Sequence, residues 1–405
     1  YAVAFYSHET RELRCHILYQ GEWTEYVVDE GENVGTFMDM KVDSNGNPHI
    51  VYYDGVNERV MYGGFEQYNA KPGEGSFTME VVETGEYGRS MNMVLDSQDR
   101  PHVVYYDTLQ TNVRYLRRTA GGWLLLPIMS DNDIGFYCDI GLTPLVDVPQ
   151  VIYFDRTELS IKYAVLENDT RWRTETVLQS DILSGPFQLA VDIAGRPFIG
   201  YKEYTYQETF NYRIAYADED GWNSDIILNE DSSEGIFGSF VISSEGYVHL
   251  AYNNGEQLVY LRNNGRVWER VTLSLGPDVH WMLDTDLSSS EEVIVAYWQG
   301  ADLKVLFTED FNFAQNSYVV APQPQLEEEA QELPSHGGGC FIATAAFGTM
   351  ARGSVRSLCS VRDSAISTSL NGASLVALYY SVSPCPASVM ADGSALRALV
   401  RELIR

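Results

Sequence analysis

The stretch FMDMKVDSNGNPHIVYYD at residues 37–54 returns at residues 91–107 as MNMVLDSQDRPHVVYYD. Each copy is an apolar segment ending near Asp, a short polar turn, and a Tyr-rich segment. Weaker copies lie at 142–155, 187–203, 240–252 and 283–298, and a truncated copy, YAVAFYS, opens the chain. Aligning the second aromatic residue gives spacings of 47, 53, 48, 47, 51 and 45 along Tyr6, Tyr53, Tyr106, Phe154, Tyr201, Tyr252 and Tyr297. A period near fifty residues indicates a repeat architecture.

Each copy is followed by a third apolar segment and often by a fourth that a Trp introduces, as at Trp123, Trp172 and Trp222. Four short strands joined by tight Gly-containing turns are what one blade of a β-propeller requires. A solenoid would use shorter repeats, and a string of sandwiches would not repeat so regularly. The sequence therefore predicts an all-β fold, a seven-bladed β-propeller over residues 1–320. Because Tyr1 aligns with Pro48 at the start of a second strand, the first blade is expected to begin without its innermost strand.

The composition narrows the classes of function. The chain has 405 residues and a formal net charge of −30, so it would repel a nucleic-acid backbone. No stretch approaches the roughly 18 consecutive apolar residues of a membrane span. The first residue is Tyr1, from which we expect export with a signal peptide removed, and hence an extracellular or cell-surface location.

The repeated polar residues have a structural interpretation. Asp54, Asp107 and Asp155 each follow a strand, where Asp commonly accepts backbone N–H bonds in the next turn. His49, His102 and His249 recur at the start of a strand, and we expect them to be packing devices. Three copies depart from the pattern: Lys202 with Glu203, Asn253, and Trp298 stand where the other copies are read to have Asp, and these four residues are candidates for a ligand-binding face.

No enzyme signature is present: the chain has no GxSxG elbow, HExxH, phosphate-binding GxxxxGK or sialidase-type Asp box. The sequence thus predicts no catalytic residue and no resident cofactor or metal. Calcium binding by the carboxylates of Asp218, Glu219 and Asp220 is an alternative, although no complete calcium loop surrounds them.

The composition changes after Val320. Residues 321–339 are rich in Pro, Glu and Gly and are predicted to be a linker. Residues 340–405 carry apolar residues at helical spacing and are predicted to form a small helical domain. The segments CFIATAAFG, LCSVRD, LYYSVSP and LRALVRELI closely resemble the CFI-box C-terminal domain, which is appended to varied exported bacterial and archaeal proteins. That resemblance implies a surface or extracellular context and assigns no activity.

Cys359 and Cys385 depart from the residues usual in that family. Their joint presence suggests a disulfide that would staple a small core. Cys340 is then left over, either for pairing between molecules or as a buried small residue.

The tail also suggests self-assembly. Residues 336–405 contain six Arg and three acidic residues, a net charge of +3, whereas the preceding chain is strongly acidic. The CFI box is apolar and of strand length, so it could supply the missing strand of the first blade, within one chain or head-to-tail between chains. The candidate donor residues are Cys340, Phe341, Ile342, Ala343, Thr344, Ala345, Ala346 and Phe347. The competing interpretation is that residues 343–350 begin a helix.

Three functions follow from these patterns. The first is a non-enzymatic extracellular protein that assembles through its tail into a filament or surface layer. The second is a lectin-like propeller that binds carbohydrate or protein and is anchored by its tail. The third is a propeller glycosidase or lyase.

Overall fold

The structure is a computed structural model that describes residues 1–307 with short gaps. The gaps are residues 8, 20–21, 68–73, 86–88, 129–131, 205–209, 219–220, 231–237, 245, 254–256, 264–267, 275–278, 289–290 and 300–301. The predicted linker at 321–339, the CFI-box domain at 340–405, the strand-donation residues 340–347 and the cysteines 359 and 385 all lie outside the described residues.

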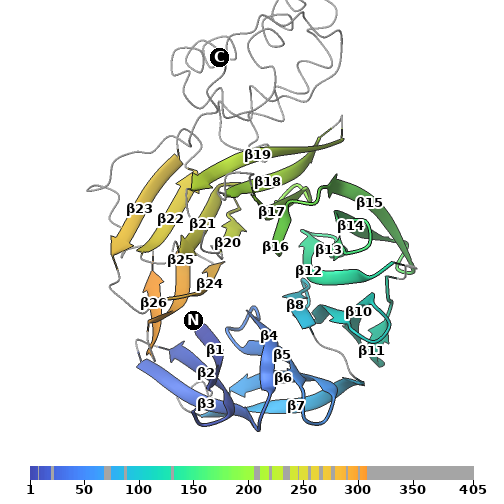
Figure 1. Ribbon diagram of the computed structural model, residues 1–405. Coiled ribbons are helices and arrows are strands. Elements are labelled where there is room, and N and C mark those ends of the chain that lie inside the picture. The colour runs from blue at the N-terminus through green and yellow to red at the C-terminus, as the bar shows by residue number, and fades with distance from the viewer. Residues whose placement is uncertain are drawn as a thin grey trace, which may run out of the picture. The chain divides into compact units, whose positions relative to one another are not determined.

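The described strands form seven antiparallel sheets, called blades 1 to 7 here in chain order (Figure 1). Blade 1 contains β1 (Ala2–Ser7), β2 (Glu12–Tyr19) and β3 (Glu22–Glu30), and blade 2 contains β4 (Val34–Val42), β5 (Pro48–Asp54), β6 (Arg59–Gln67) and β7 (Gly75–Thr84). Blade 3 contains β8 (Arg89–Leu95), β9 (Pro101–Asp107), β10 (Asn112–Thr119) and β11 (Gly122–Leu125), and blade 4 contains β12 (Ile134–Thr143), β13 (Val148–Asp155), β14 (Ser160–Glu167) and β15 (Arg171–Gln179). Blade 5 contains β16 (Leu183–Val191), β17 (Pro197–Tyr204), β18 (Phe210–Asp218) and β19 (Gly221–Glu230). Blade 6 contains β20 (Gly238–Ile242), β21 (Val248–Asn253), β22 (Gln257–Asn263) and β23 (Trp268–Ser274), and blade 7 contains β24 (Val279–Leu287), β25 (Val293–Gln299) and β26 (Asp302–Phe307).

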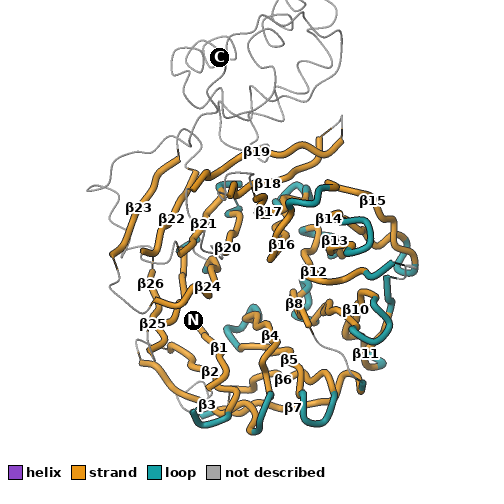
Figure 2. The backbone as a smooth tube through the Cα atoms, viewed as in Figure 1, coloured by secondary structure: helices purple, strands orange, loops and turns teal. Residues whose placement is uncertain are grey.

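The described residues form an all-β, seven-bladed β-propeller, as the repeat predicts. Figure 2 shows strands joined by loops, with no helix in the part of the chain that is described. Blade 1 has three strands, of which β1 corresponds to the second strand of the other blades, so the expected truncation is confirmed for the described residues. The chain forms two compact units that divide between Leu189 and Ala190, within β16. No helix in the described ranges is suited in length and apolarity to crossing a membrane.

The hydrophobic core lies between successive blades. Every residue of β9 is buried, whereas the outermost strand β15 contains only exposed and half-buried residues. One cluster joins Val104 and Tyr115 of blade 3 to Ile140 and Tyr153 of blade 4. A strand that packs against a blade on each side needs apolar residues on both of its faces, which explains the near-continuous apolar runs in the repeat.

The first strands of neighbouring blades are joined by polar side chains. The backbone N–H of Met93 donates to Asp39 Oδ2 at 2.7 Å, and that of Leu189 donates to Asp139 Oδ2 at 2.7 Å. At the same position of blade 3, the Asn92 amide donates to the Cys138 carbonyl at 2.7 Å. In the second unit, the N–H of Thr285 donates to Ser239 Oγ at 2.9 Å. Because the atoms bonded are mostly backbone, this position needs a polar side chain but tolerates Asp, Asn or Ser.

Asp139 makes one of these contacts sensitive to pH. Burial raises its pKa from 3.8 to about 7, against the backbone hydrogen bonds from Leu189 and Ile140, while Asp39 adds to the rise and Lys41 opposes it. Between about pH 4 and pH 7 the folded protein therefore holds a proton that the unfolded chain has released. The contribution of Asp139 to the free energy of unfolding should fall as pH rises through this window and stay constant above it.

Asp139→Asn should remove that dependence, although it exchanges one of the two acceptor oxygens for a donor. We expect the stability difference between wild type and the variant to shrink from pH 4.5 to pH 7.5. The expected decrease is about 1.4 kcal/mol for each pH unit between the pKa values of Asp139 in the unfolded and folded chain. Urea-unfolding midpoints at pH 4.5, 6 and 7.5 measure it. A difference that is the same at all three values would contradict the assignment.

The turns between the first and second strands carry a second connection, which we call the serine–acid clasp. In blades 2 and 3, Ser44 donates to Asp99 through its N–H at 2.9 Å and through its hydroxyl at 2.5 Å. Ser97 makes the same pair of bonds to Asp147 of blade 4. In blades 6 and 7, the N–H of Ser244 donates to Glu291 at 3.2 Å.

All three clasp acids have left-handed backbone conformations, with φ of +59° at Asp99, +52° at Asp147 and +64° at Glu291. This conformation disfavours a side chain, and glycine occupies the corresponding position in blades 2, 5 and 6. Blade 5 has Ile193 where the clasp has Ser, and the next blade has Gly246 in place of the acid. The acid thus occurs where a serine on the preceding blade can offset its backbone strain.

A double-mutant cycle on this clasp tests the compensation. Ser44→Ala should cost about 1 kcal/mol of unfolding free energy in wild type, because Asp99 keeps its strain and loses the hydroxyl donor, while the backbone N–H of residue 44 still bonds it. In the Asp99→Gly background the same substitution should cost almost nothing. Asp99→Gly alone should be near neutral, since relief of about 1 kcal/mol of backbone strain offsets the lost bonds. Equal costs of Ser44→Ala in both backgrounds would show that the two residues are not coupled.

Candidate functional site

The residues singled out from the sequence as a ligand face are largely buried. Lys202 of β17 is 3% exposed and Asn253 of β21 is 1% exposed, so neither side chain offers appreciable surface to a ligand. Burial lowers the pKa of Lys202 to about 8. Glu203 forms an ion pair with Arg213 on the adjacent strand at 2.6 Å. Trp298 lies in β25, and its side chain is outside the described part of the structure.

The structure also corrects the register assigned to three of these residues. Asp43, Asp192 and Ser243 each accept a hydrogen bond from the backbone N–H four residues later, which marks the same turn in three blades. Tyr53 lies ten residues after Asp43, Lys202 lies ten residues after Asp192, and Asn253 lies ten residues after Ser243, so Lys202 and Asn253 occupy the position of Tyr53. Trp298 lies ten residues after Ser288 and occupies the same position. They replace the second aromatic residue and not the aspartate, whereas Glu203 does occupy the aspartate position. The sequence alignment slipped by one because it matched Tyr201, Tyr252 and Tyr297 to Tyr53.

The repeated aspartates are turn caps. Asp54, Asp107 and Asp155 each accept two backbone N–H bonds, from residues two and three positions later, at 2.9–3.1 Å. This is the role that the sequence predicted for them.

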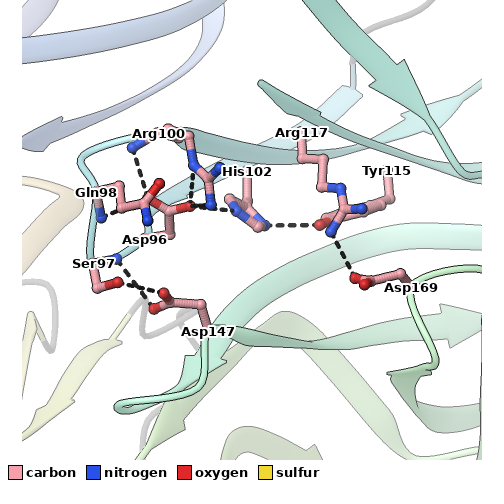
Figure 3. Close-up of polar contacts among 9 residues, drawn as sticks. All are labelled: Asp96, Ser97, Gln98, Arg100, His102, Tyr115, Arg117, Asp147 and Asp169. Carbon is pink, nitrogen blue, oxygen red and sulfur yellow. Dashed lines mark hydrogen bonds and ion pairs between the residues drawn. The ribbon is translucent and has the colours of Figure 1, made fainter. Parts of the chain in front are cut away.

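The repeated histidines are internal, and Figure 3 shows one set in blade 3. His102 is 3% exposed; one ring nitrogen lies 3.4 Å from Asp96 and the other 2.7 Å from the Tyr115 hydroxyl. Burial lowers the pKa of His102 despite the nearby Asp96, so the ring is neutral near pH 7. A neutral ring can donate to Asp96 and accept from Tyr115, which satisfies all three groups. His249 bonds Tyr260 at 2.6 Å in the same way, so these histidines hold strands together.

A partly exposed aromatic cluster lies in the first unit, where blades 3, 4 and 5 meet. We call it the Tyr137 patch and define it as Asp133, Phe136, Tyr137, Phe154 and Arg156. The rings of Phe136 and Tyr137 are 4.4 Å apart, and Tyr137 and Phe154 both pack on Phe187 of β16, at 5.7 and 5.3 Å. Phe136, Tyr137 and Phe154 are half-buried, while Phe187 beneath them is 3% exposed.

Local backbone geometry presents Tyr137 on this patch. The residue lies in a β-bulge of β12, where the register against β13 shifts between Phe136 and Asp139, and its φ is +54°. The ring lies against Gly185, where any added Cβ would approach Tyr137 Cδ2 to 2.3 Å. A bulky residue with positive φ is strained, and bulges and strained residues concentrate at functional sites.

Charged groups border the aromatic rings. Asp133 accepts a hydrogen bond from the Tyr106 hydroxyl at 2.6 Å and one from Arg156 Nη1 at 3.0 Å. The guanidinium carbon of Arg156 lies 5.3 Å from the centre of the Phe136 ring, within the range of a cation–π contact. Burial, with the hydrogen bond to Asp133, raises the pKa of Tyr106. The patch therefore combines aromatic surface with an oriented donor and acceptor, as small-molecule binding sites do.

The sequence patterns did not reveal this patch. Its signal was the pair Phe136–Tyr137 just before a first-strand repeat, but adjacent aromatic residues are common in β-rich chains. Register shifts also occur in the first strands β4, β8 and β24, and Ser90 has the same φ of +54° at the equivalent position of blade 3. What distinguishes blade 4 from blade 3 is the large aromatic residue, Tyr137, at this position. Among the described residues, no group of three or more His, Cys, Asp or Glu side chains is placed to hold a metal, and Glu219 and Asp220 of the calcium alternative are not described.

Comparison with known proteins finds similarity in fold only. No family model matches the chain, and no curated protein matches it. Among solved structures, an ulvan lyase of polysaccharide lyase family PL25 matches with a TM-score of 0.55 and 11% identity, over 75% of this chain and 88% of that one. Hydrazine synthase from Kuenenia stuttgartiensis matches with a TM-score of 0.50 and 8% identity, over 73% and 89%. The fucose-binding lectin of Aleuria aurantia, a six-bladed propeller, has a TM-score of 0.47 and 12% identity over 72% and 97%. At these identities the likeness shows the β-propeller fold and nothing finer.

Proposed function

We propose that this protein is a non-catalytic, glycan-binding β-propeller that holds sugar rings on the Tyr137 patch. The observation that carries the proposal is the strained, half-buried Tyr137, whose ring lies edge-to-face with Phe136 and shares the buried Phe187 beneath it with Phe154. The apolar C–H face of a sugar ring can stack on one of these partly exposed rings, and its hydroxyl groups can exchange hydrogen bonds with Arg156 and Asp133.

The polar groups of the patch favour binding over catalysis. Both carboxylate oxygens of Asp133 already accept hydrogen bonds, Oδ1 from Tyr106 and Oδ2 from Arg156, so this carboxylate is engaged within the protein and is not directed at a substrate proton. The ulvan lyase match adds a precedent for a polysaccharide ligand on a propeller scaffold, as its name indicates. The carboxylates and rings on this patch give no reason to transfer its reaction to this chain.

The filament hypothesis drawn from the sequence depends on residues 321–405, none of which is described. The Tyr137 patch supports the lectin-like alternative, because partly exposed aromatic rings beside hydrogen-bonding groups are the side chains that a sugar would contact. An exported location, expected from the CFI-box resemblance, would expose this site to extracellular polysaccharides.

A glycan array probed with the full chain, followed by calorimetric titration of the best oligosaccharide, tests the proposal. We expect saturable binding with one dominant class of sugar, at a dissociation constant in the micromolar to millimolar range. An array without signal at high protein concentration would overturn the proposed function.

A further inference from the structure

We infer that Asp133 makes the Tyr137 patch selective for uncharged sugars, by pairing with the positive charge of Arg156 that would otherwise attract uronate or sulfated sugars. This inference rests on the proposed function and specifies its ligand class. It assigns Asp133 as a specificity-determining residue.

Asp133 is held firmly in the position that this role requires. Its backbone N–H donates to Thr157 Oγ1 at 3.0 Å, and its carbonyl accepts from the Arg156 N–H at 2.9 Å. Its two carboxylate oxygens are divided, with Oδ1 accepting from Tyr106 and Oδ2 from Arg156. Thus backbone bonds on both sides place the carboxylate between Tyr106 and Arg156.

Arg156 is fixed as well, although its side chain is 53% exposed. The guanidinium is held between the Asp133 carboxylate and the face of Phe136. An arginine that recognises a carboxylate or sulfate does so best with a bidentate fork and an uncompensated charge. Here the charge is compensated and one N–H group is committed, so Arg156 is better suited to donate single hydrogen bonds to hydroxyl groups.

The surrounding charges also disfavour an anionic ligand. Asp155 and Glu158 belong to the same turn as Arg156; Asp155 is a buried turn cap, and Glu158 is paired with Lys162. The whole chain carries a net charge of −30. An approaching anion therefore finds both cations, Arg156 and Lys162, already paired with carboxylates, and it meets the repulsion of an acidic protein.

Asp133→Asn should reverse the selectivity with little other change. The amide oxygen can replace Oδ1 and keep accepting from Tyr106. The amide nitrogen replaces Oδ2 and is a donor, which cannot bond the donor on Arg156. The substitution removes one negative charge and releases the guanidinium for a ligand carboxylate.

The experiment compares neutral and anionic probes on wild type and variants by calorimetric titration at low salt. The neutral probe is the best uncharged oligosaccharide from the array, and the anionic probe is an oligoglucuronate of similar length. Wild type should bind the neutral probe at least tenfold more tightly, and Asp133→Asn should shift the ratio of the two affinities at least tenfold toward the uronate. Asp169→Asn is the matched control: it frees Arg117 by removing an exposed carboxylate elsewhere on blade 4, and it should leave the ratio unchanged.

Each outcome is decisive. Wild-type binding of glycans without preference, or an Asp133→Asn ratio equal to that of wild type, overturns the inference while the proposed function stands. No binding of any glycan by wild type overturns both. If Asp133→Asn does not fold, Arg156→Met replaces it: weaker neutral-sugar binding with uronate still rejected supports the inference, whereas selective loss of uronate binding overturns it.

Discussion

Asp96→Ala is expected to lower the free energy of unfolding by about 3 kcal/mol, the largest effect on stability that we predict. Its side chain is buried; one oxygen accepts from the backbone N–H groups of Gln98 and Arg100, both at 2.9 Å. The other accepts from the Arg100 side chain at 2.7 Å and faces His102 at 3.4 Å (Figure 3). These bonds overcome the effect of burial and lower the pKa of Asp96, so the charged form is stabilised in the fold. Removing the carboxylate leaves buried donors without an acceptor.

Asp96→Ser is the matched variant, because blade 6 has serine at this position. Ser243 accepts from the Tyr247 N–H at 3.0 Å, and His249 and Tyr260 still form their bond in that blade. We therefore expect serine to recover about half of the stability lost with alanine. Urea unfolding followed by tryptophan fluorescence measures both variants. Equal stability of Asp96→Ala and wild type would show that the buried network contributes nothing.

Tyr137→Gly should weaken glycan binding by about 30- to 100-fold, as expected for an aromatic residue at the centre of a binding site. Stability should change by less than about 1 kcal/mol, because the lost ring contacts are offset by relief of the strain at φ +54°. Tyr137→Phe keeps the ring and should bind within a few-fold of wild type. Calorimetric titration with the array-selected oligosaccharide measures all three proteins.

Leu145→Gly controls for the backbone effect. Leu145 also has a left-handed conformation, with φ of +71°, and its side chain is 90% exposed in another turn of blade 4. Its substitution should leave glycan affinity unchanged. Undiminished binding by Tyr137→Gly, or an equal loss in Leu145→Gly, would remove Tyr137 from the binding site.

Lys202 occupies the position of Tyr53 in its blade, and the error in its register shows what the repeat pattern can and cannot predict. The pattern predicted the strands correctly, because each copy carries its own apolar run and turn residues. It misplaced Lys202, Asn253 and Trp298 by one position. The second strand of blade 2 has two consecutive tyrosines, and a single Tyr in another blade can be aligned with either of them. The turn caps Asp192 and Ser243 mark the correct register, but serine at a cap is a weak signal in a sequence rich in serine.

The sequence by itself determined the all-β class, the number of blades, the truncated first blade and the structural role of the repeated Asp residues. These properties depend on contacts between residues close in the chain, which repeat with the period of the blades. Only the tertiary structure decided that Tyr137 and Phe154 pack over the buried Phe187, close to Phe136, Arg156 and Asp133, and that Ser44 contacts Asp99. Those contacts join different strands and blades, up to 55 residues apart in the case of the clasp, and their geometry depends on a bulge and on left-handed residues that leave little trace in composition.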